Sequence, residues 1–290
     1  MKLITFRDNW GYKVGALISN DQVVDLTFLV SDRSMTAAEV SKCFDLDSGF
    51  LHKAEKVVND AGSDTISLND LKIAASVPSP GKIICIGLNY RDHAEESGMA
   101  IPEKPVIFSK FSSCIIAHSE PIVVPKDSTQ TDYEAELAVV IGRSATNVRR
   151  EDAMNYVFGY ANFNDVSARD FQFADSQWQR GKSCDTFAPI GPFVATTNEI
   201  PDPQDLSIKF RLNSQTMQDS NTKQMIFGVA ELLEYLSNYF TLEPGDVIAT
   251  GTPPGVGFAR KPPVYLKDSD VAEVEIAGLG VLSNPVVGGR

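Results

Sequence analysis

Residues 131–142 read TDYEAELAVVIG, a run in which acidic residues give way to apolar ones. As a β-strand, this run places Glu134 and Glu136 on the same face, ~6.7 Å apart at two residues of rise. The strand continues through residues 138–141, which are apolar on both faces, so we expect the two carboxylates to lie beside buried surface. The alternative is a strand whose polar face is exposed to water.

Two buried carboxylates this close cannot both stay ionised without a compensating cation. Neither His nor Cys lies near them in the run, and ligation by oxygen alone selects Mg²⁺, Mn²⁺ or Ca²⁺ over Zn²⁺. Asp165 offers a third carboxylate where the strand-like run of residues 159–163 ends. The alternative role for Asp165 is to cap the helix expected after it, and spacing alone favours that role.

Residues 87–98, GLNYRDHAEESG, predict a short helix in which His93 and Glu96 are neighbours at i and i+3. Asp92 suits the N-cap of this helix, and Gly98 suits its end. An imidazole held by a carboxylate is a competent general base near neutral pH. The alternative is a solvated surface turn with an incidental ion pair.

Two further segments offer groups that bind anions. Residues 179–183, QRGKS, contain a Gly-Lys-Ser tripeptide, but a P-loop needs Gly at position 176, where this chain has Ser176. We therefore reject a P-loop and keep Lys182 as a candidate cation near the acidic residues. Residues 251–257 follow a predicted strand and could bring backbone amides and the Thr252 hydroxyl to an anion; a plain tight turn is the alternative.

The composition indicates a folded protein and excludes several kinds of partner. The 290 residues include 26 Lys+Arg and 38 Asp+Glu, which gives a formal net charge of −12, and 43% of them are hydrophobic. This apolar content excludes intrinsic disorder, and the negative charge argues against nucleic acid or an anionic membrane as partner. No run of ~18 apolar residues predicts a membrane span. Without a signal-like N-terminus or a CxxC pair, we expect a cytoplasmic protein with reduced thiols.

The pattern of predicted elements divides the chain into two domains. Residues 1–78 predict a small α/β domain, and residues 79–290 a larger one, because the VPSPG sequence at residues 77–81 breaks regular structure. The elements expected in the first domain are a hairpin over residues 12–26 and helices over residues 36–43 and 50–59.

The second domain is mostly strand-like. Residues 83–86 form a short apolar run typical of a buried strand, and residues 206–212 alternate between apolar and polar, as a half-buried strand does. Residues 271–276 add another strand, whereas residues 229–240 predict one amphipathic helix. The fold class predicted for the whole chain is therefore α+β, mainly β.

Together these motifs resemble the fumarylacetoacetate hydrolase superfamily over about residues 80–287, in the order that the family has them. The resemblance rests on GLNYxxH at residues 87–93, DYEAEL at 132–137, NDVSARD at 164–170, GKSxDTFxP at 181–189, DSNT at 219–222 and PGDVIxTGTP at 244–253. It implies a catalytic C-terminal domain with a mixed β-roll and sandwich fold, a variable N-terminal domain, and assembly as a homodimer.

The resemblance also implies roles for the acidic residues and the histidine. A divalent cation would be held by Glu134, Glu136 and Asp165, with Mg²⁺ expected and Mn²⁺ or Ca²⁺ as alternatives. His93 and Glu96 would form a catalytic dyad on a lid that orders over bound substrate.

The remaining matches concern the substrate: Lys182 as a catalytic residue, and Arg169, Gln172 and Thr252 as substrate-binding residues. The family's substrates are 2-oxo acids with a second activating carbonyl, such as acylpyruvates. The leading hypothesis is therefore Mg²⁺-dependent hydrolysis of a C–C bond in a 2,4-dioxo acid, either an acylpyruvate or a diketo sugar acid. His93 would deprotonate the attacking water, and the products would be pyruvate and a second acid.

Two alternatives to hydrolysis stay open. The same residues could serve decarboxylation or tautomerisation of oxaloacetate, or isomerisation or hydration of an unsaturated 2-oxo acid, because each passes through a related enolate. A non-catalytic metal- or metabolite-binding protein on the same fold is the alternative from another class.

Overall fold

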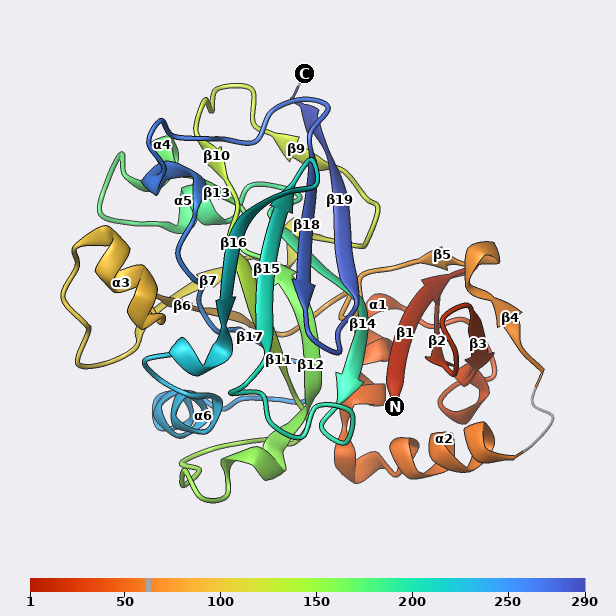
Figure 1. Ribbon diagram of the computed structural model, residues 1–290. Helices are drawn as coiled ribbons and strands as arrows, with labels where there is room; N and C mark the ends of the chain where they lie inside the picture. The colour runs from red at the N-terminus through yellow and green to blue at the C-terminus, as the bar shows by residue number, and fades with distance from the viewer. Residues whose placement is uncertain (61–63, 290) are drawn as a thin grey trace.

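The computed structural model describes residues 1–60 and 64–289 and shows a mainly β chain with short helices (Figure 1). The α-helices are α1 (Ala37–Val40), α2 (Phe50–Asn59), α3 (Arg91–Ser97), α4 (Arg169–Gln172), α5 (Gln179–Lys182) and α6 (Val229–Ser237). The strands are β1 (Lys2–Arg7), β2 (Tyr12–Leu17), β3 (Gln22–Asp25), β4 (Ile66–Ser67), β5 (Lys72–Ile73), β6 (Ile83–Gly87), β7 (Val106–Lys110), β8 (Ile115–Ile116), β9 (Ile122–Val124), β10 (Thr131–Asp132), β11 (Ala135–Ile141), β12 (Val157–Asn164), β13 (Ser167–Ala168), β14 (Ala188–Thr196), β15 (Ser207–Leu212), β16 (Gln215–Asn221), β17 (Val247–Ala249), β18 (Val271–Ile276) and β19 (Val281–Gly288). The predicted α+β, mainly β class is confirmed.

A twelve-stranded sheet organises the molecule around β11. Its order is β4-β3-β2-β1-β14-β12-β11-β17-β6-β7, with β5 beside β1 and β8 beside β14. Every residue of β11 is buried, as its continuous apolar run predicts for a strand covered on both faces. The strand expected over residues 131–142 is interrupted at Tyr133 and Glu134, because β10 pairs with β13 while β11 pairs with β12 and β17.

A second sheet covers the first. It has five strands in the order β16-β15-β18-β19-β9, and it packs across β11, β12 and β14. Tyr133 and Phe210 stack between the two layers with ring centroids 4.0 Å apart. The amphipathic helix predicted over residues 229–240 is α6, which ends at Ser237 and buries its apolar face. The two layers thus form a sandwich, and the acidic residues lie at one end of its fully buried strands β11 and β12.

The N-terminal elements lie on the opposite side of the sandwich from α3, α4 and α5 (Figure 1). Strands β2 and β3 form the hairpin predicted for residues 12–26, and α2 matches the helix predicted at residues 50–59. Strand β1 pairs with β14, so the N-terminal strands continue the large sheet. A division of the chain at residue 78 stays a prediction. No helix in residues 1–60 or 64–289 has the length and apolar character to cross a membrane.

Candidate active site

Three carboxylates from separate segments meet at the end of β11. Glu136 lies in β11, Glu134 in the break before it, and Asp165 directly after β12. The backbone N–H of Asp165 donates to the Glu134 carbonyl oxygen (2.9 Å), and the Glu134 N–H donates to Asn164 Oδ1 (3.1 Å). The Gly251 N–H donates to Glu136 Oε2 (2.8 Å). One carboxylate oxygen from each of the three acids lies within 4.8 Å of the others, and all three residues are buried.

Two buried lysines pair with this cluster. Lys182 Nζ lies 2.7 Å from Glu134 Oε2 and 2.8 Å from Asp165 Oδ2. Lys110 Nζ lies 2.5 Å from Asp165 Oδ1 and donates to the Val166 carbonyl oxygen (3.0 Å). Asp165 therefore binds two ammonium groups and does not cap α4, whose N-cap residue is Ala168.

Arg169 links the cluster to the loop after β17. Its Nη2 donates to Glu134 (2.6 Å), its Nη1 to Gln172 Oε1 (2.9 Å) and its Nε to Asp132 Oδ2 (2.9 Å). Asp132 also accepts the backbone N–H groups of Gly257 and Phe258. Three of the five N–H groups of Arg169 donate in these bonds, and the other two have no acceptor within the described ranges.

The buried charges do not balance. Seven Asp, Glu, Lys and Arg side chains are buried together here, four acids and three bases: Asp132, Glu134, Glu136, Asp165, Lys110, Arg169 and Lys182. Among the residues that the structure describes, Glu136 is the acid of this set without an ion pair. A buried unpaired carboxylate is costly unless a cation compensates it. The cluster therefore lacks one positive partner beside Glu136.

The pKa shifts follow this imbalance. Burial raises the pKa of Glu134, but the charges of Lys182 and Arg169 outweigh burial and lower it to about 2. Burial, and then the Asp165 and Glu134 carboxylates, raise the pKa of Glu136 well above its usual value. Burial lowers the pKa of Lys182, but Asp165 and Glu134 outweigh it and raise it to about 12. Three convergent oxygen donors with an uncompensated charge fit a hard divalent cation.

Helix α3 lies over the cluster and carries the predicted dyad. His93 Nδ1 lies 3.3 Å from Glu96 Oε2, and both Glu96 oxygens accept the Gly255 N–H at 3.1 Å. Gly98 ends the helix in the left-handed conformation (φ 63°), as predicted. The prediction of Asp92 as N-cap is wrong: the N-cap residue is Tyr90, because Asp92 accepts the Ser220 hydroxyl (2.5 Å) and so joins α3 to β16.

A cavity of about 130 Å³ lies between α3, the predicted lid, and the cluster. Seven of the nine predicted site residues line it: His93, Glu134, Glu136, Arg169, Gln172, Lys182 and Thr252. The other two lie directly behind it, Glu96 against His93 and Asp165 against Lys182. The Thr252 hydroxyl donates to the Ala135 carbonyl oxygen (2.9 Å) and accepts from Gln218, so a ligand would meet its oxygen and not its hydrogen.

Two buried partners of the site had no predicted role, Lys110 and Asp132. Lys110 ends β7, whose sequence VIFSK places one lysine after a mostly apolar run. Asp132 opens the DYEAEL motif, and an acidic residue two positions before Glu134 could have indicated a partner for Arg169.

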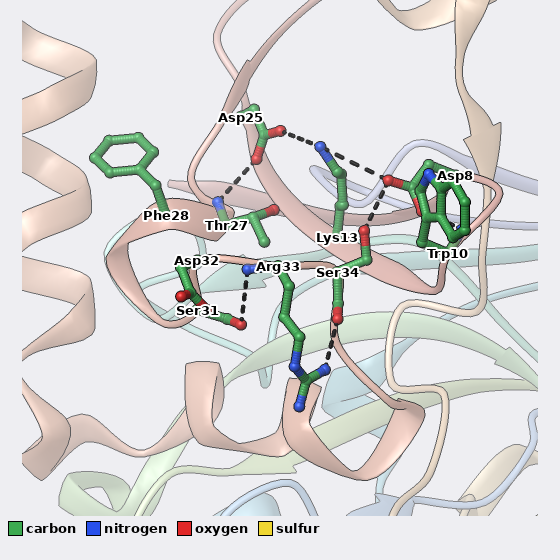
Figure 2. Close-up of a pocket in the computed structure, with 10 residues that line it drawn as sticks. All are labelled: Asp8, Trp10, Lys13, Asp25, Thr27, Phe28, Ser31, Asp32, Arg33 and Ser34. Atoms are coloured by element: carbon green, nitrogen blue, oxygen red, sulfur yellow. Dashed lines mark hydrogen bonds and ion pairs between the residues drawn. The ribbon is translucent and has the colours of Figure 1, made fainter.

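A second pocket, of about 690 Å³, lies among the N-terminal elements and contains none of the predicted site residues (Figure 2). Lys13 Nζ lies 3.2 Å from Asp25 Oδ2 and 3.8 Å from Asp8 Oδ2. Asp8 also accepts the Ser34 hydroxyl and the Trp10 backbone N–H (2.7 and 2.8 Å). This triad also has one more carboxylate than ammonium, but about 30% of each side chain is exposed, so water compensates the excess charge.

Known proteins resemble this chain in sequence and in fold. The family described as "Fumarylacetoacetate (FAA) hydrolase C-terminal" matches residues 82–287. A fumarylacetoacetate hydrolase domain-containing protein 2 homolog of Dictyostelium discoideum is 46% identical over 301 residues, covering 99% of this chain and 97% of that protein. An "oxaloacetate tautomerase fahd2, mitochondrial" of Xenopus laevis is 48% identical over 230 residues, 79% of this chain and 72% of that protein.

A solved structure with bound ligands has the same fold. It is maleylpyruvate hydrolase from Sphingobium sp. SYK-6 in complex with manganese(II) ion and pyruvate, with 30% identity, a TM-score of 0.84 and full coverage of both chains. The family match includes the strands from β6 onward, the acidic cluster and α3, but not β1–β5. The chain therefore belongs to the fumarylacetoacetate hydrolase family, as its motifs indicate.

Proposed function

We propose that this chain is a divalent-cation-dependent enzyme that interconverts the keto and enol forms of oxaloacetate or a similarly short 2-oxo acid. The proposal is carried by the cavity of about 130 Å³, which has carboxylates on its floor and His93 under its lid. Because a protein cavity of about 150 Å³ holds a molecule the size of benzene, this cavity suits a small acid. The Xenopus relative is named an oxaloacetate tautomerase, which supports the same reading.

Glu134, Glu136 and Asp165 would hold the cation, for which we propose Mg²⁺. Bound there, a divalent cation supplies Lewis-acid polarisation of the carbonyl and carboxylate oxygens of a 2-oxo acid. Lys182, which stays protonated at neutral pH, supplies a fixed positive charge for the oxyanion that develops at the ketone. The two unused N–H groups of Arg169 are donors for a carboxylate of the substrate.

His93 moves the proton in this proposal. Glu96 holds Nδ1, which leaves Nε2 as the ring nitrogen that can accept a proton from C3 of the substrate. Glu96 also stabilises the imidazolium that forms, and the Gly255 N–H keeps its carboxylate in place. Return of the proton to the C2 oxygen completes the keto-to-enol conversion without loss or gain of atoms.

Hydrolysis of an acylpyruvate, the leading hypothesis from the sequence, is the second candidate. In that reaction His93 would accept a proton from water, which then attacks the distal carbonyl. The relative bound to manganese(II) and pyruvate is a maleylpyruvate hydrolase, and this observation favours the hydrolytic alternative. Both reactions need the same cation site, so the substrate distinguishes them.

One assay separates the two candidates. Oxaloacetate enriched in its enol form is followed by ultraviolet absorbance with Mg²⁺ and with EDTA, while pyruvate release from acylpyruvates and oxaloacetate is measured with a coupled dehydrogenase. Accelerated enol decay that requires Mg²⁺, without pyruvate release, supports the tautomerase. Pyruvate release from acylpyruvates alone establishes the hydrolase instead, and no turnover in either assay contradicts both.

The homodimer and the cytoplasmic location also stay proposals. Sedimentation velocity of the purified chain tests the dimer, since a monomer of 31.6 kDa is clearly resolved from its dimer. Localisation of the tagged chain tests the location, and the name of the Xenopus relative gives mitochondria as the specific alternative.

A further inference from the structure

The cavity at the acidic cluster has a larger neighbour. A groove of about 770 Å³ runs along β6 and β7 and the segment before α5. The two hollows share two lining residues, Phe108 and Trp178. These aromatic side chains therefore separate a cavity of about 130 Å³ from an open groove several times larger.

The wall between the hollows is closely packed. The rings of Phe108 and Trp178 meet edge to face, with centroids 5.4 Å apart. Lys182 Nζ lies 4.8 Å from the Phe108 ring centroid, so Phe108 is the member of the wall beside the acidic cluster. The indole of Trp178 lies over Gly87, where an added Cβ would come within 3.1 Å of Cζ3. Because Gly87 has no side chain, the indole can pack directly against its backbone.

The backbone and the side chain of Trp178 have separable roles. The Trp178 carbonyl oxygen accepts the N–H groups of Gly181 and Lys182, both at 3.0 Å, and so helps to place α5 with its lysine. The indole takes no part in these bonds. Removing the indole therefore leaves the hydrogen bonds that position Lys182 in place.

The rest of the outer cavity wall is apolar. Met99 from the lid segment, Phe173 and Phe258 line it together with the two wall residues. Phe258 is stacked against Arg169, with the guanidinium carbon 4.5 Å from the ring centroid. A substrate held by the carboxylate cluster and Arg169 would point its far end toward these rings, where no additional charged side chain from the described residues lines the cavity.

We propose that the indole of Trp178, braced by Phe108, forms the distal wall of the substrate cavity and limits the length of the 2-oxo acid that the enzyme accepts. This inference rests on the proposed function, because it assigns the acid end of the substrate to the carboxylate cluster. With the indole removed, the cavity opens into the groove along β7, and an apolar chain beyond the fourth carbon of the acid can extend there.

The test compares two acids in the wild type and in Trp178→Ala. The kcat/KM ratio of an acylpyruvate with a pentanoyl group to oxaloacetate is expected to rise about tenfold or more in the variant, the effect of a few methylene groups in an apolar pocket. Binding of two unreactive probes, oxalate and 2-oxooctanoate, is measured by calorimetry with Mg²⁺ present. The affinity for 2-oxooctanoate relative to oxalate is expected to rise by a similar factor.

Control variants distinguish an effect on substrate length from an effect on folding. Trp178→Phe keeps a ring and should change the ratios less, and Trp178→Leu provides the comparison if the alanine variant melts early. Trp10→Phe, at an 86% exposed position, should change neither ratio. This variant also leaves Trp178 as the sole tryptophan of the chain, so its emission should shift when oxalate binds.

The outcomes are distinguishable. If both ratios stay unchanged or fall in folded Trp178→Ala and Trp178→Leu proteins, the proposal that the Trp178 indole limits substrate length is wrong. If the wild type turns over neither substrate, the proposed function is wrong. If Trp178→Ala nevertheless binds 2-oxooctanoate more tightly relative to oxalate than the wild type does, the role of Trp178 as the distal wall is supported.

Discussion

In the described part of the chain, two clusters each place one lysine between two carboxylates, and they differ in burial. Lys13, Asp8 and Asp25 lie at the N-terminal pocket with about 30% of each side chain exposed. Lys182 lies between Glu134 and Asp165 with 2% of its side chain exposed. At the surface the N–O distances are 3.2 and 3.8 Å, whereas in the buried cluster they are 2.7 and 2.8 Å.

Both clusters consist of one lysine and two carboxylates, and burial is what makes one of them a candidate active site. An exposed ion pair contributes about 0–1 kcal/mol because water solvates both charges. Removal of one partner from a buried pair costs about 3–5 kcal/mol, because the other charge is left without solvent or partner. The buried cluster also includes Glu136, a carboxylate without an ion pair in the described chain, and our proposal assigns to this residue the cluster's affinity for a cation.

The largest effect is expected from Lys182→Met. Loss of the ammonium leaves Glu134 and Asp165 short of one positive partner, so the free energy of unfolding without metal should fall by about 3–5 kcal/mol. Turnover should fall about 10²-fold or more, because the charge facing the oxyanion is gone. Urea unfolding and the enol-decay assay measure the two effects, and added Mg²⁺ should restore part of the stability. A loss below 1 kcal/mol would contradict the distinction between the clusters.

Glu136→Gln should have opposite effects on stability and on metal binding. Affinity for Mg²⁺ should fall about 100-fold or more, since one charged ligand is lost. At a pH above the raised pKa of Glu136, the metal-free protein should become about 1–3 kcal/mol more stable, because a buried unpaired charge is removed. Calorimetric Mg²⁺ titration and urea unfolding with EDTA measure these changes. A variant that is destabilised without metal would show that Glu136 is already compensated.

The pH dependence of the unfolding free energy is an independent test of Glu136→Gln. Because the pKa of Glu136 is raised in the folded protein, its contribution is present below its usual pKa of 4.5 and is lost as the pH rises through the raised value. Glu134 has the opposite sign: its pKa of about 2 makes the protein lose stability as the pH falls below 4.5. Glu136→Gln should remove the loss of stability above pH 4.5 and keep the loss of stability below it.

The sequence predicted the acidic side of the buried cluster better than its basic side. The carboxylates stand next to a long apolar run and are visible as a local pattern. Lys110 is 55 residues from Asp165 along the chain, and only the pairing of β7 with β6 brings it into the site. The break in the strand at Glu134 was also not predicted. It depends on the Asn164 side chain, whose Oδ1 accepts the Glu134 N–H in place of a backbone carbonyl of a neighbouring strand.

Contacts with residues distant in the chain also explain the wrong N-cap prediction for Asp92 and the incomplete prediction for Thr252. Asp92 has the residue type and position of an N-cap, but a serine 128 positions later competes for its carboxylate. Thr252 has a hydroxyl suited to an anion, yet its hydrogen is taken by a backbone carbonyl of β11. Local patterns identified the residue types correctly, whereas tertiary partners decide which of their atoms stay free.

The lid dyad lies between the two clusters in burial, and Glu96→Gln should have an effect of intermediate size. His93 and Glu96 have 10% and 31% of their side chains exposed. The amide can still accept from His93 and from Gly255, but it lacks the charge that stabilises an imidazolium, so kcat should fall about tenfold. KM and Mg²⁺ affinity should stay unchanged, since Glu96 acts through His93. An increase in KM alone would instead assign Glu96 to substrate binding.

The smallest effect is expected from Lys13→Met at the surface cluster. Asp8 keeps its hydrogen bonds from Ser34 and Trp10, which lower its pKa more than Lys13 does, and Asp25 keeps its bond from the Thr27 N–H. Water solvates both carboxylates once the ammonium is gone, so unfolding free energy should change by about 1 kcal/mol or less. Turnover and Mg²⁺ affinity should equal those of the wild type. The small stability change should shrink further at high salt, because ions screen exposed charges. A loss as large as that in Lys182→Met would mean that burial is not what separates the two clusters, and that the N-terminal pocket has a structural role that its exposed carboxylates do not explain.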